Sequence, residues 1–224
     1  MASSSDAPAA RYRYAAVFVL TLTLLVFVII APNEDWSRAV ALSLESVALI
    51  VAIATSRAGR EVRRIRTAAV GVLGALAVIG VGVGVLGPTA TTLLSGALAI
   101  AIPLSLVRGL LRLVTVHGVT LQAVAGALAI YLLIGLLFAW LIGFIAQVDS
   151  SPYFATGTDG TVGERAYFSL TVLTTTGFGD FTAGQPVGRA LAVLEMLVGQ
   201  LYLVTVIGLV VGNFTGRRRQ ERED

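Results

Sequence analysis

The feature that most limits the fold of this chain is a series of long apolar runs separated by short charged breaks. Of its 224 residues, 56% are hydrophobic and 13% are charged, and the mean hydropathy is +0.87. A water-soluble domain of this size could not expose that surface without precipitating. A helix needs about 20 mostly apolar residues to span a bilayer, whereas barrel strands give short alternating segments. The chain is therefore predicted to be an all-α membrane protein.

Six runs along the chain are apolar enough to be read as transmembrane helices. They cover 15–31, 39–55, 67–86, 89–107, 119–148 and 187–214. Pro32 and the polar residues after it form a turn rather than a small-residue cleavage site, so a cleaved signal peptide is not expected. The Gly87-Pro88 pair separates the third run from the fourth.

Arginine clusters predict how the six runs are oriented. All sixteen basic residues are arginine, and twelve of them lie within 11–13, 57–66, 108–112 and 217–219. Counted across alternating spans, these clusters fall on one side, as the positive-inside rule requires. We therefore expect a multi-pass protein of the plasma membrane with both termini in the cytoplasm. Because the arginines serve as topology signals, the net charge of +3 does not indicate nucleic-acid binding. The missing lysine suggests a GC-rich bacterial genome.

The segment between the fifth and sixth runs, 164–181, reads ERAYFSLTVLTTTGFGDF and is too short and too polar to cross the membrane and return. We predict that it re-enters the membrane as a helix followed by a loop, because Gly177 and Gly179 end helical structure. Non-helical backbone at membrane depth is tolerated only where it is buried in protein or lines a water-filled cavity. The loop is therefore expected to face a pore.

The residues of this loop suit a path for a dehydrated cation. Backbone carbonyl oxygens that point to one axis can replace the water shell of an ion without fixed charge. Gly177 and Gly179 can adopt positive φ, which lets consecutive carbonyl groups point inward. Thr176 and Phe178 then point outward into packing. Thr175 adds a hydroxyl oxygen at the inner end, where the C-terminus of the preceding helix also favours a cation.

The stretch TTTGFGD, 174–180, resembles the T-T-V-G-Y-G-D signature of potassium channels, and the resemblance extends over about 119–214. It implies a carbonyl ladder that binds K+, formed by Thr175, Thr176, Gly177 and Phe178. Gly179 and Asp180 would form the outer mouth. Within the last run, the resemblance further implies that Gly199 is a hinge. It also implies a cavity lining formed by Leu203, Ile207 and Val211. One chain supplies one filter strand, so a homotetramer in the lipid bilayer is expected.

The chain departs from the signature at two filter positions. Thr176 replaces valine and Phe178 replaces tyrosine, so one hydroxyl that tethers the filter is absent and a new one is present. Thr171 stands where some members of the family carry a glutamate that bonds the outer aspartate. Related channels with phenylalanine in the filter remain potassium-selective, so the resemblance implies that selectivity survives.

We predict four parts of the chain. A cytoplasmic tail covers 1–14, and a four-helix transmembrane domain, which resembles a voltage-sensor domain without its arginine ladder, covers 15–112. The pore domain covers 113–214, with an outer helix over 119–148, a pore helix over 164–174, the filter over 175–180 and an inner helix over 187–214. A cytoplasmic tail covers 215–224, so no soluble regulatory domain is expected in the chain.

The fourth run indicates weak or absent voltage gating. It contains no basic residue over 89–107, and Arg108 and Arg112 lie at its cytoplasmic end, where long side chains snorkel to the interface. Moving one gating charge across the membrane potential changes the energy by about 2.3 kcal/mol per 100 mV. A helix without a charge in the field therefore has no such voltage-dependent energy.

Two carboxylates lie within apolar runs, Glu45 in the second and Glu195 in the sixth. Intramembrane acids are costly, so Glu45 is either functional or a protonated helix-contact residue. We expect Glu195 to brace the pore helix rather than bind an ion, on a helical face different from that of Gly199 and Leu203.

Other classes of function are less favoured by the sequence. With one histidine and no cysteine, no nucleophile-base pair or metal cluster indicates an enzyme, and no cofactor is expected besides K+ as the permeant ion. A non-selective monovalent cation channel is the nearest alternative, because small filter changes relax selectivity. A potassium transporter subunit is a weaker one, because such chains hold four pore repeats and this chain holds one.

Overall fold

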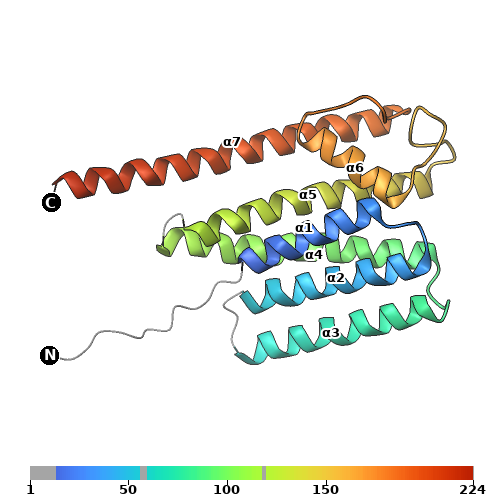
Figure 1. Ribbon diagram of the computed structural model, residues 1–224, viewed down its shortest axis with the longest axis horizontal. Coiled ribbons are helices and arrows are strands. Elements are labelled where there is room, and N and C mark those ends of the chain that lie inside the picture. Colours follow the sequence, from blue (N-terminus) through green and yellow to red (C-terminus); the bar gives the residue numbers. More distant parts are fainter. Residues whose placement is uncertain (1–13, 56–59, 118–119, 224) are drawn as a thin grey trace.

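The computed structural model describes residues 14–55, 60–117 and 120–223, and its regular elements are helices joined by loops and turns, with no strand among these residues. Six of the helices are long, and Figure 1 shows them side by side, with the start of α1 and the end of α7 at the same end of the bundle. In chain order the helices are α1 (Tyr14–Ile30), α2 (Asp35–Thr55), α3 (Arg60–Gly82), α4 (Pro88–His117), α5 (Leu121–Val148), the short α6 (Val162–Leu173) and α7 (Pro186–Glu223).

Four of the helices are long and apolar enough to cross a membrane. These segments are Asp35–Ala54, Ala90–Val107, Leu121–Val148 and Pro186–Val206. Two shorter apolar helices, Tyr14–Ile30 and Thr67–Gly82, lie alongside them. The all-helical membrane architecture therefore agrees with the prediction from hydropathy.

Local sequence signals fix where several helices begin. Pro88 and Pro186 are the first residues of α4 and α7, where the missing N–H of proline costs nothing. Thr120 caps α5, because its side chain accepts a hydrogen bond from the Ala123 N–H. Pro32 follows α1, and the Ser37 hydroxyl donates to its carbonyl oxygen at 2.5 Å. The predicted breaks at Pro32 and Gly87-Pro88 are thus present.

Several of the predicted boundaries were wrong. Most of the basic segment 57–66, predicted as a loop, belongs to the first turns of α3, which begins at Arg60. The fourth helix continues past 107 to His117, so Arg108 and Arg112 lie on α4 itself. The last helix runs to Glu223 rather than ending at 214. Arginine and glutamate are good helix formers, and a helix does not end where its apolar run ends.

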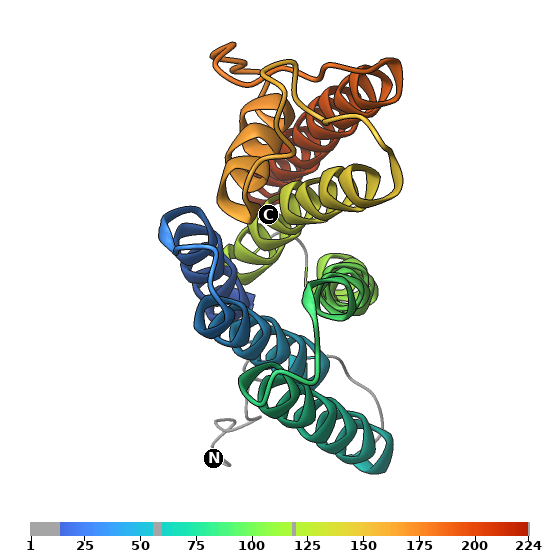
Figure 2. The ribbon, with the colours of Figure 1, turned by 90° about the vertical axis from the view of Figure 1, so that its right-hand side faces the viewer.

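Helix α5 joins the two halves of the molecule. It packs against α1 and α4 on one side and against α6 and α7 on the other, as the end-on view in Figure 2 makes visible. One buried apolar cluster lies between α1, α2, α4 and α5 and includes Tyr14, Leu49, Ile102 and Ile130. A second cluster supports α6 from the outer loops, and it includes Ile142, Phe154 and Phe168.

Candidate functional site

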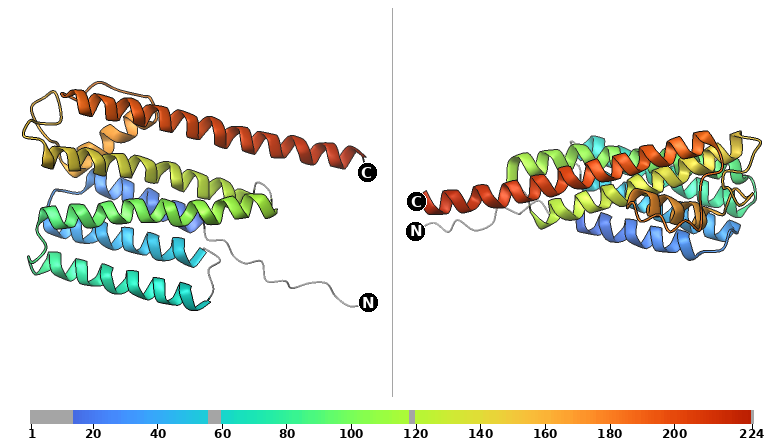
Figure 3. Two further views of the ribbon diagram at one scale, coloured as in Figure 1. Left: turned by 180° about the vertical axis from the view of Figure 1, so that it is seen from behind. Right: turned by 90° about the horizontal axis from the view of Figure 1, so that it is seen from above.

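Helix α6 lies between α5 and α7 at the end of the bundle opposite the start of α1 and the end of α7 (Figures 1 and 3). A capping box fixes its start: the Thr161 N–H donates to the Glu164 carboxylate at 2.6 Å, and the Glu164 N–H donates to the Thr161 hydroxyl at 3.2 Å. The helix therefore begins at Val162, two residues before the predicted start, and the Thr-x-x-Glu pattern in the sequence could have indicated this.

The backbone after α6 alternates between two kinds of conformation. Gly177 and Gly179 have φ of 52° and 83°, as predicted, and Thr175 also has a positive φ, 57°. Thr175 is the one residue other than glycine with a positive φ in the described part of the chain. A β-branched residue adopts this conformation only at a cost, and the surrounding structure must enforce it. Alternating conformations let successive carbonyl groups point to one side instead of to opposite sides.

Hydrogen bonds hold one side of this segment and leave the other side open. The N–H groups of Thr175, Thr176 and Gly177 donate to carbonyl oxygens near the end of α6, at 2.8 to 3.1 Å. Over the described residues, no hydrogen bond ends on the carbonyl oxygens of 174–179. The segment thus turns its N–H groups toward α6 and keeps a series of carbonyl oxygens available to an ion.

Threonine hydroxyls tie the segment to α6. The Thr174 hydroxyl donates to the Leu170 carbonyl at 2.7 Å, and its oxygen lies 2.9 Å from that of Thr176. Because the Thr174 proton is used by Leu170, Thr176 is the donor of this pair. The threonine that replaces valine in the potassium-channel signature therefore adds a tether that valine could not make.

The outer end of the segment is held by an aromatic contact. Phe178 stacks on Tyr167 of α6 with ring centroids 6.4 Å apart and planes 5° from parallel. The Asp180 carboxylate also interacts with the Tyr167 hydroxyl, and this interaction raises the pKa of Tyr167. The hydroxyl that Phe178 lacks is thus supplied next to the filter by a tyrosine of α6.

The end of α6 is fixed by α5 and α7 together. The Tyr131 hydroxyl donates to the Leu173 carbonyl oxygen at 3.2 Å. Gly199 lies against the same carbonyl, so that a Cβ at this position would collide with the Leu173 oxygen. Helix α7 is continuous through Gly199, and the structure therefore assigns this glycine a close helix contact. The hinge role that the resemblance implies for Gly199 is not tested by this contact and stays a prediction.

Glu195 is fully buried against α6. Its Oε1 lies 2.5 Å from the Ser169 hydroxyl, which is also 2.6 Å from the Gly135 carbonyl oxygen. This contact agrees with the expected support of the pore helix. The expected difference in helical face was wrong, because Glu195 and Gly199 are one turn apart and both face α6. Burial raises the pKa of the nearby loop residue Tyr153.

The predicted cavity residues are only partly described. Leu203 is half-buried. Positions 207 and 211 belong to α7, but the side chains of Ile207 and Val211 lie outside the described part of the structure. On α7, the Gln200 side-chain amide donates a hydrogen bond to the Thr175 hydroxyl of the filter at 3.0 Å. Sequence reasoning missed this residue because nothing local distinguishes it from other positions on the helix.

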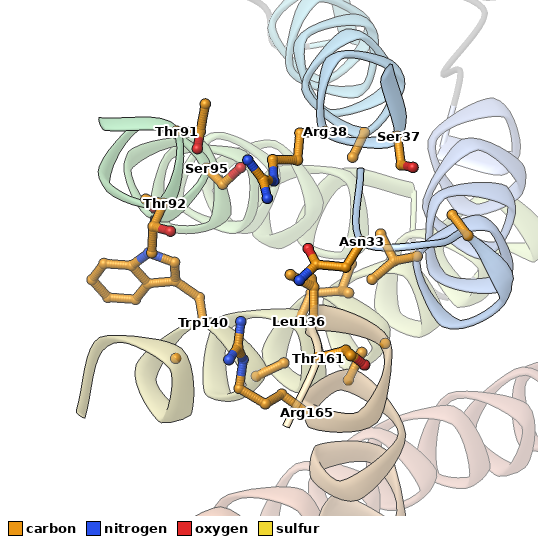
Figure 4. Close-up of a pocket in the computed structure, with 18 of the residues that line it drawn as sticks. Asn33, Ser37, Arg38, Thr91, Thr92, Ser95, Leu136, Trp140, Thr161 and Arg165 are labelled. Carbon is orange, nitrogen blue, oxygen red and sulfur yellow. Dashed lines mark hydrogen bonds between the residues drawn. The ribbon is translucent and has the colours of Figure 1, made fainter. Parts of the chain in front are cut away.

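A cavity of about 240 Å³ lies apart from the filter, among α2, α4, α5 and α6 (Figure 4). Glu45 lines it, with a hydrogen bond to Ser95 and with a buried Oε2 that has no partner among the described residues. Arg38 and Arg165 point into it from opposite sides.

Both guanidinium groups at this cavity have local partners. Arg38 pairs with Asp35 at 2.8 Å, and Arg165 donates to the Gly160 carbonyl at 2.9 Å. Burial lowers the pKa of Arg165, while the charges of Asp159 and Glu164 oppose the shift. Because two arginines and one carboxyl group line this cavity, it lacks the uniform lining of an ion path.

Comparison with known proteins gives one match. A family model described as "Ion channel" matches residues 126–215, which run from α5 through α6 and the filter segment into α7. No curated protein and no solved structure matched the chain. The matched residues are those that hold the open carbonyl series, so the comparison and the geometry both support an ion channel in a membrane.

Proposed function

We propose that this chain is one subunit of a homotetrameric, potassium-selective channel that conducts K+ passively. The observation that carries the proposal is the segment 174–180, where positive φ alternates along the backbone and the carbonyl oxygens of 174–179 have no partner among the described residues. Carbonyl rings of this kind replace the hydration shell of a potassium ion. Thr175, Thr176, Gly177 and Phe178 would bind the ion, with Gly179 and Asp180 at the outer mouth.

Four copies are proposed because one strand of carbonyl groups cannot surround an ion. Helix α7 supports this assembly, since a broad apolar side of it is uncovered in the single chain. Its exposed residues include Val193, Leu194, Leu197 and Leu201, each more than half exposed. Phe178 of the filter is also 69% exposed. Other copies of the chain, packed around a common axis, would cover these side chains.

Six membrane spans are proposed in each subunit. Helix α1 has 17 residues, which give a length of about 26 Å at 1.5 Å per residue, close to the hydrocarbon thickness of about 30 Å. The apolar part of α3, Thr67–Gly82, is similar in length. From the arginine clusters we propose that both termini are cytoplasmic, and we propose the plasma membrane as the location. With no basic residue over 89–107, gating by voltage would be weak or absent.

The test is a measurement of reversal potential. The purified full-length protein is reconstituted in planar bilayers with K+ on one side and Na+ on the other, and the reversal potential should lie close to the K+ equilibrium value. A potential near zero would indicate a non-selective cation channel. Currents absent under all voltages and ionic conditions would refute a channel.

A pair of glycine variants links selectivity to the filter. Gly177 and Gly157 both have positive φ, 52° and 82°, and a Cβ on either would meet no atom within 4 Å. Alanine costs roughly 1–2 kcal/mol in this conformation at both sites. Gly177→Ala should abolish or relax K+ selectivity, whereas Gly157→Ala, in an outer loop, should leave it unchanged. Equal effects of the two substitutions would show that selectivity resides elsewhere.

A further inference from the structure

We propose that Gln200 is a specificity-determining residue of the channel, which holds the Thr175 hydroxyl at the inner end of the filter. The inference rests on the proposed function and adds to it a residue outside the signature segment. It starts from the hydrogen bond of 3.0 Å between the Gln200 amide Nε2 and the Thr175 Oγ1. In the described part of α7, no other side chain forms a hydrogen bond with residues 174–180.

The contact exists because α7 approaches α6 very closely one residue earlier. Gly199 lies against the Leu173 carbonyl oxygen, where any side chain would collide. That carbonyl is also held by the Tyr131 hydroxyl. Since Leu173 is the last residue of α6, this close approach brings the next residue of α7, Gln200, beside the first turn of the filter.

Thr175 needs such a partner for two reasons. It is a β-branched residue with a positive φ of 57°, a conformation that persists only where neighbours enforce it. Its side chain also carries a methyl group and a hydroxyl on one carbon, so a change of χ1 exchanges the one for the other. The Gln200 amide can donate to the hydroxyl but not to the methyl group, and it therefore selects the rotamer.

The rotamer of Thr175 decides whether its hydroxyl oxygen can contact the ion. A hydroxyl oxygen offers two lone pairs, of which the Gln200 amide uses one and leaves one for a cation. The amide oxygen of Gln200 remains as a further acceptor. In a fourfold assembly, four such amides would surround the inner entrance of the filter. An apolar side chain at 200 would release the hydroxyl, and the ion would have to select the binding rotamer itself.

The experiment measures unitary K+ current against K+ concentration for the full chain in planar bilayers. Gln200→Leu should raise the half-saturating K+ concentration about fivefold, the factor that corresponds to one neutral hydrogen bond. Gln200→Met should do the same, which guards against a folding defect in one variant. Val85→Ala, on an exposed site between α3 and α4 and away from α7, is the control and should not change it.

A double-mutant cycle with Thr175→Val tests the mechanism. Valine has the shape of threonine without the hydroxyl, so Gln200→Leu should have no further effect in that background. If Gln200→Leu has its full effect in the Thr175→Val background, the role of Gln200 is overturned. The same holds if Gln200→Leu alone leaves the K+ dependence of the current unchanged. In both cases the proposal of a K+ channel stands. A wild-type chain without K+-selective current overturns both proposals.

Discussion

Replacing Glu195 by glutamine tests whether the carboxyl group of Glu195 is protonated where it meets the Ser169 hydroxyl. The Ser169 Oγ lies 2.6 Å from the Gly135 carbonyl oxygen and 2.5 Å from the Glu195 Oε1. A hydroxyl has one proton, and the carbonyl can only accept it. If Ser169 donates to Gly135, then the proton of the second contact belongs to the carboxyl group. We therefore expect Glu195 to be a neutral acid that donates to Ser169.

The surroundings of Glu195 agree with a neutral side chain. It is 0% exposed, and its Oε2 has no partner among the described residues. The described residues also give it no ion pair. The neighbouring tyrosine hydroxyls, of Tyr131 and Tyr153, point to other acceptors, the carbonyl oxygens of Leu173 and Gly188. An unpaired carboxylate in such a place would cost several kcal/mol, and protonation avoids that cost.

The expected magnitudes follow from these contacts. Glutamine has nearly the volume of glutamic acid and retains a donor for Ser169, so Glu195→Gln should change the free energy of unfolding by less than about 1 kcal/mol. Ser169→Ala removes the partner of a buried carboxyl group and should cost about 1–3 kcal/mol. Ser43→Ala is the matched control, because the Ser43 hydroxyl donates only to Ala39 of its own helix, and its effect should be small.

Denaturant unfolding of the purified protein in detergent micelles measures these differences, and the K+ over Na+ reversal potential of the same variants reports on the filter. If Glu195 were ionised, Glu195→Gln would no longer be the milder of the two substitutions. Glu195→Gln would then lose a charge-assisted hydrogen bond worth about 1.5–3 kcal/mol. If it destabilises the protein as much as Ser169→Ala does, the neutral assignment is refuted.

Three further outcomes are expected. Gly199→Ala should destabilise the assembled channel by about 1–3 kcal/mol, because the added carbon collides with the Leu173 carbonyl oxygen. Thermal dissociation of the channel measures this loss, and a variant as stable as wild type would contradict the close contact. Tyr167→Phe removes the hydroxyl that interacts with the Asp180 carboxylate and should speed the decay of K+ current during sustained recording, with unchanged decay as the contrary result. Arg108→Gln combined with Arg112→Gln should leave the conductance-voltage curve unchanged, and a steep curve abolished by this pair would overturn the prediction of weak voltage gating.

The sequence could predict the features of the site that depend on neighbouring residues. Hydropathy alone indicates an all-helical membrane protein, because an unsatisfied backbone group in lipid is too costly for other structures. The positive φ of Gly177 and Gly179 follows from the freedom of glycine, and the chain breaks at Pro32 and Gly87-Pro88 follow from proline chemistry. The start of α6 was also within reach, since Thr161 and Glu164 form a capping box of fixed spacing.

Contacts between distant residues were decided only by the tertiary structure. The Tyr131 hydroxyl reaches a carbonyl 42 positions away, and Glu195 meets Ser169 across 26 positions. Helical periodicity gives the residues that share a face, but it does not say which neighbour that face meets. The sequence thus determined where the backbone could expose a series of carbonyl oxygens. The packing of α5 and α7 around α6 determined which side chains hold it, because such contacts depend on how helices approach one another in space.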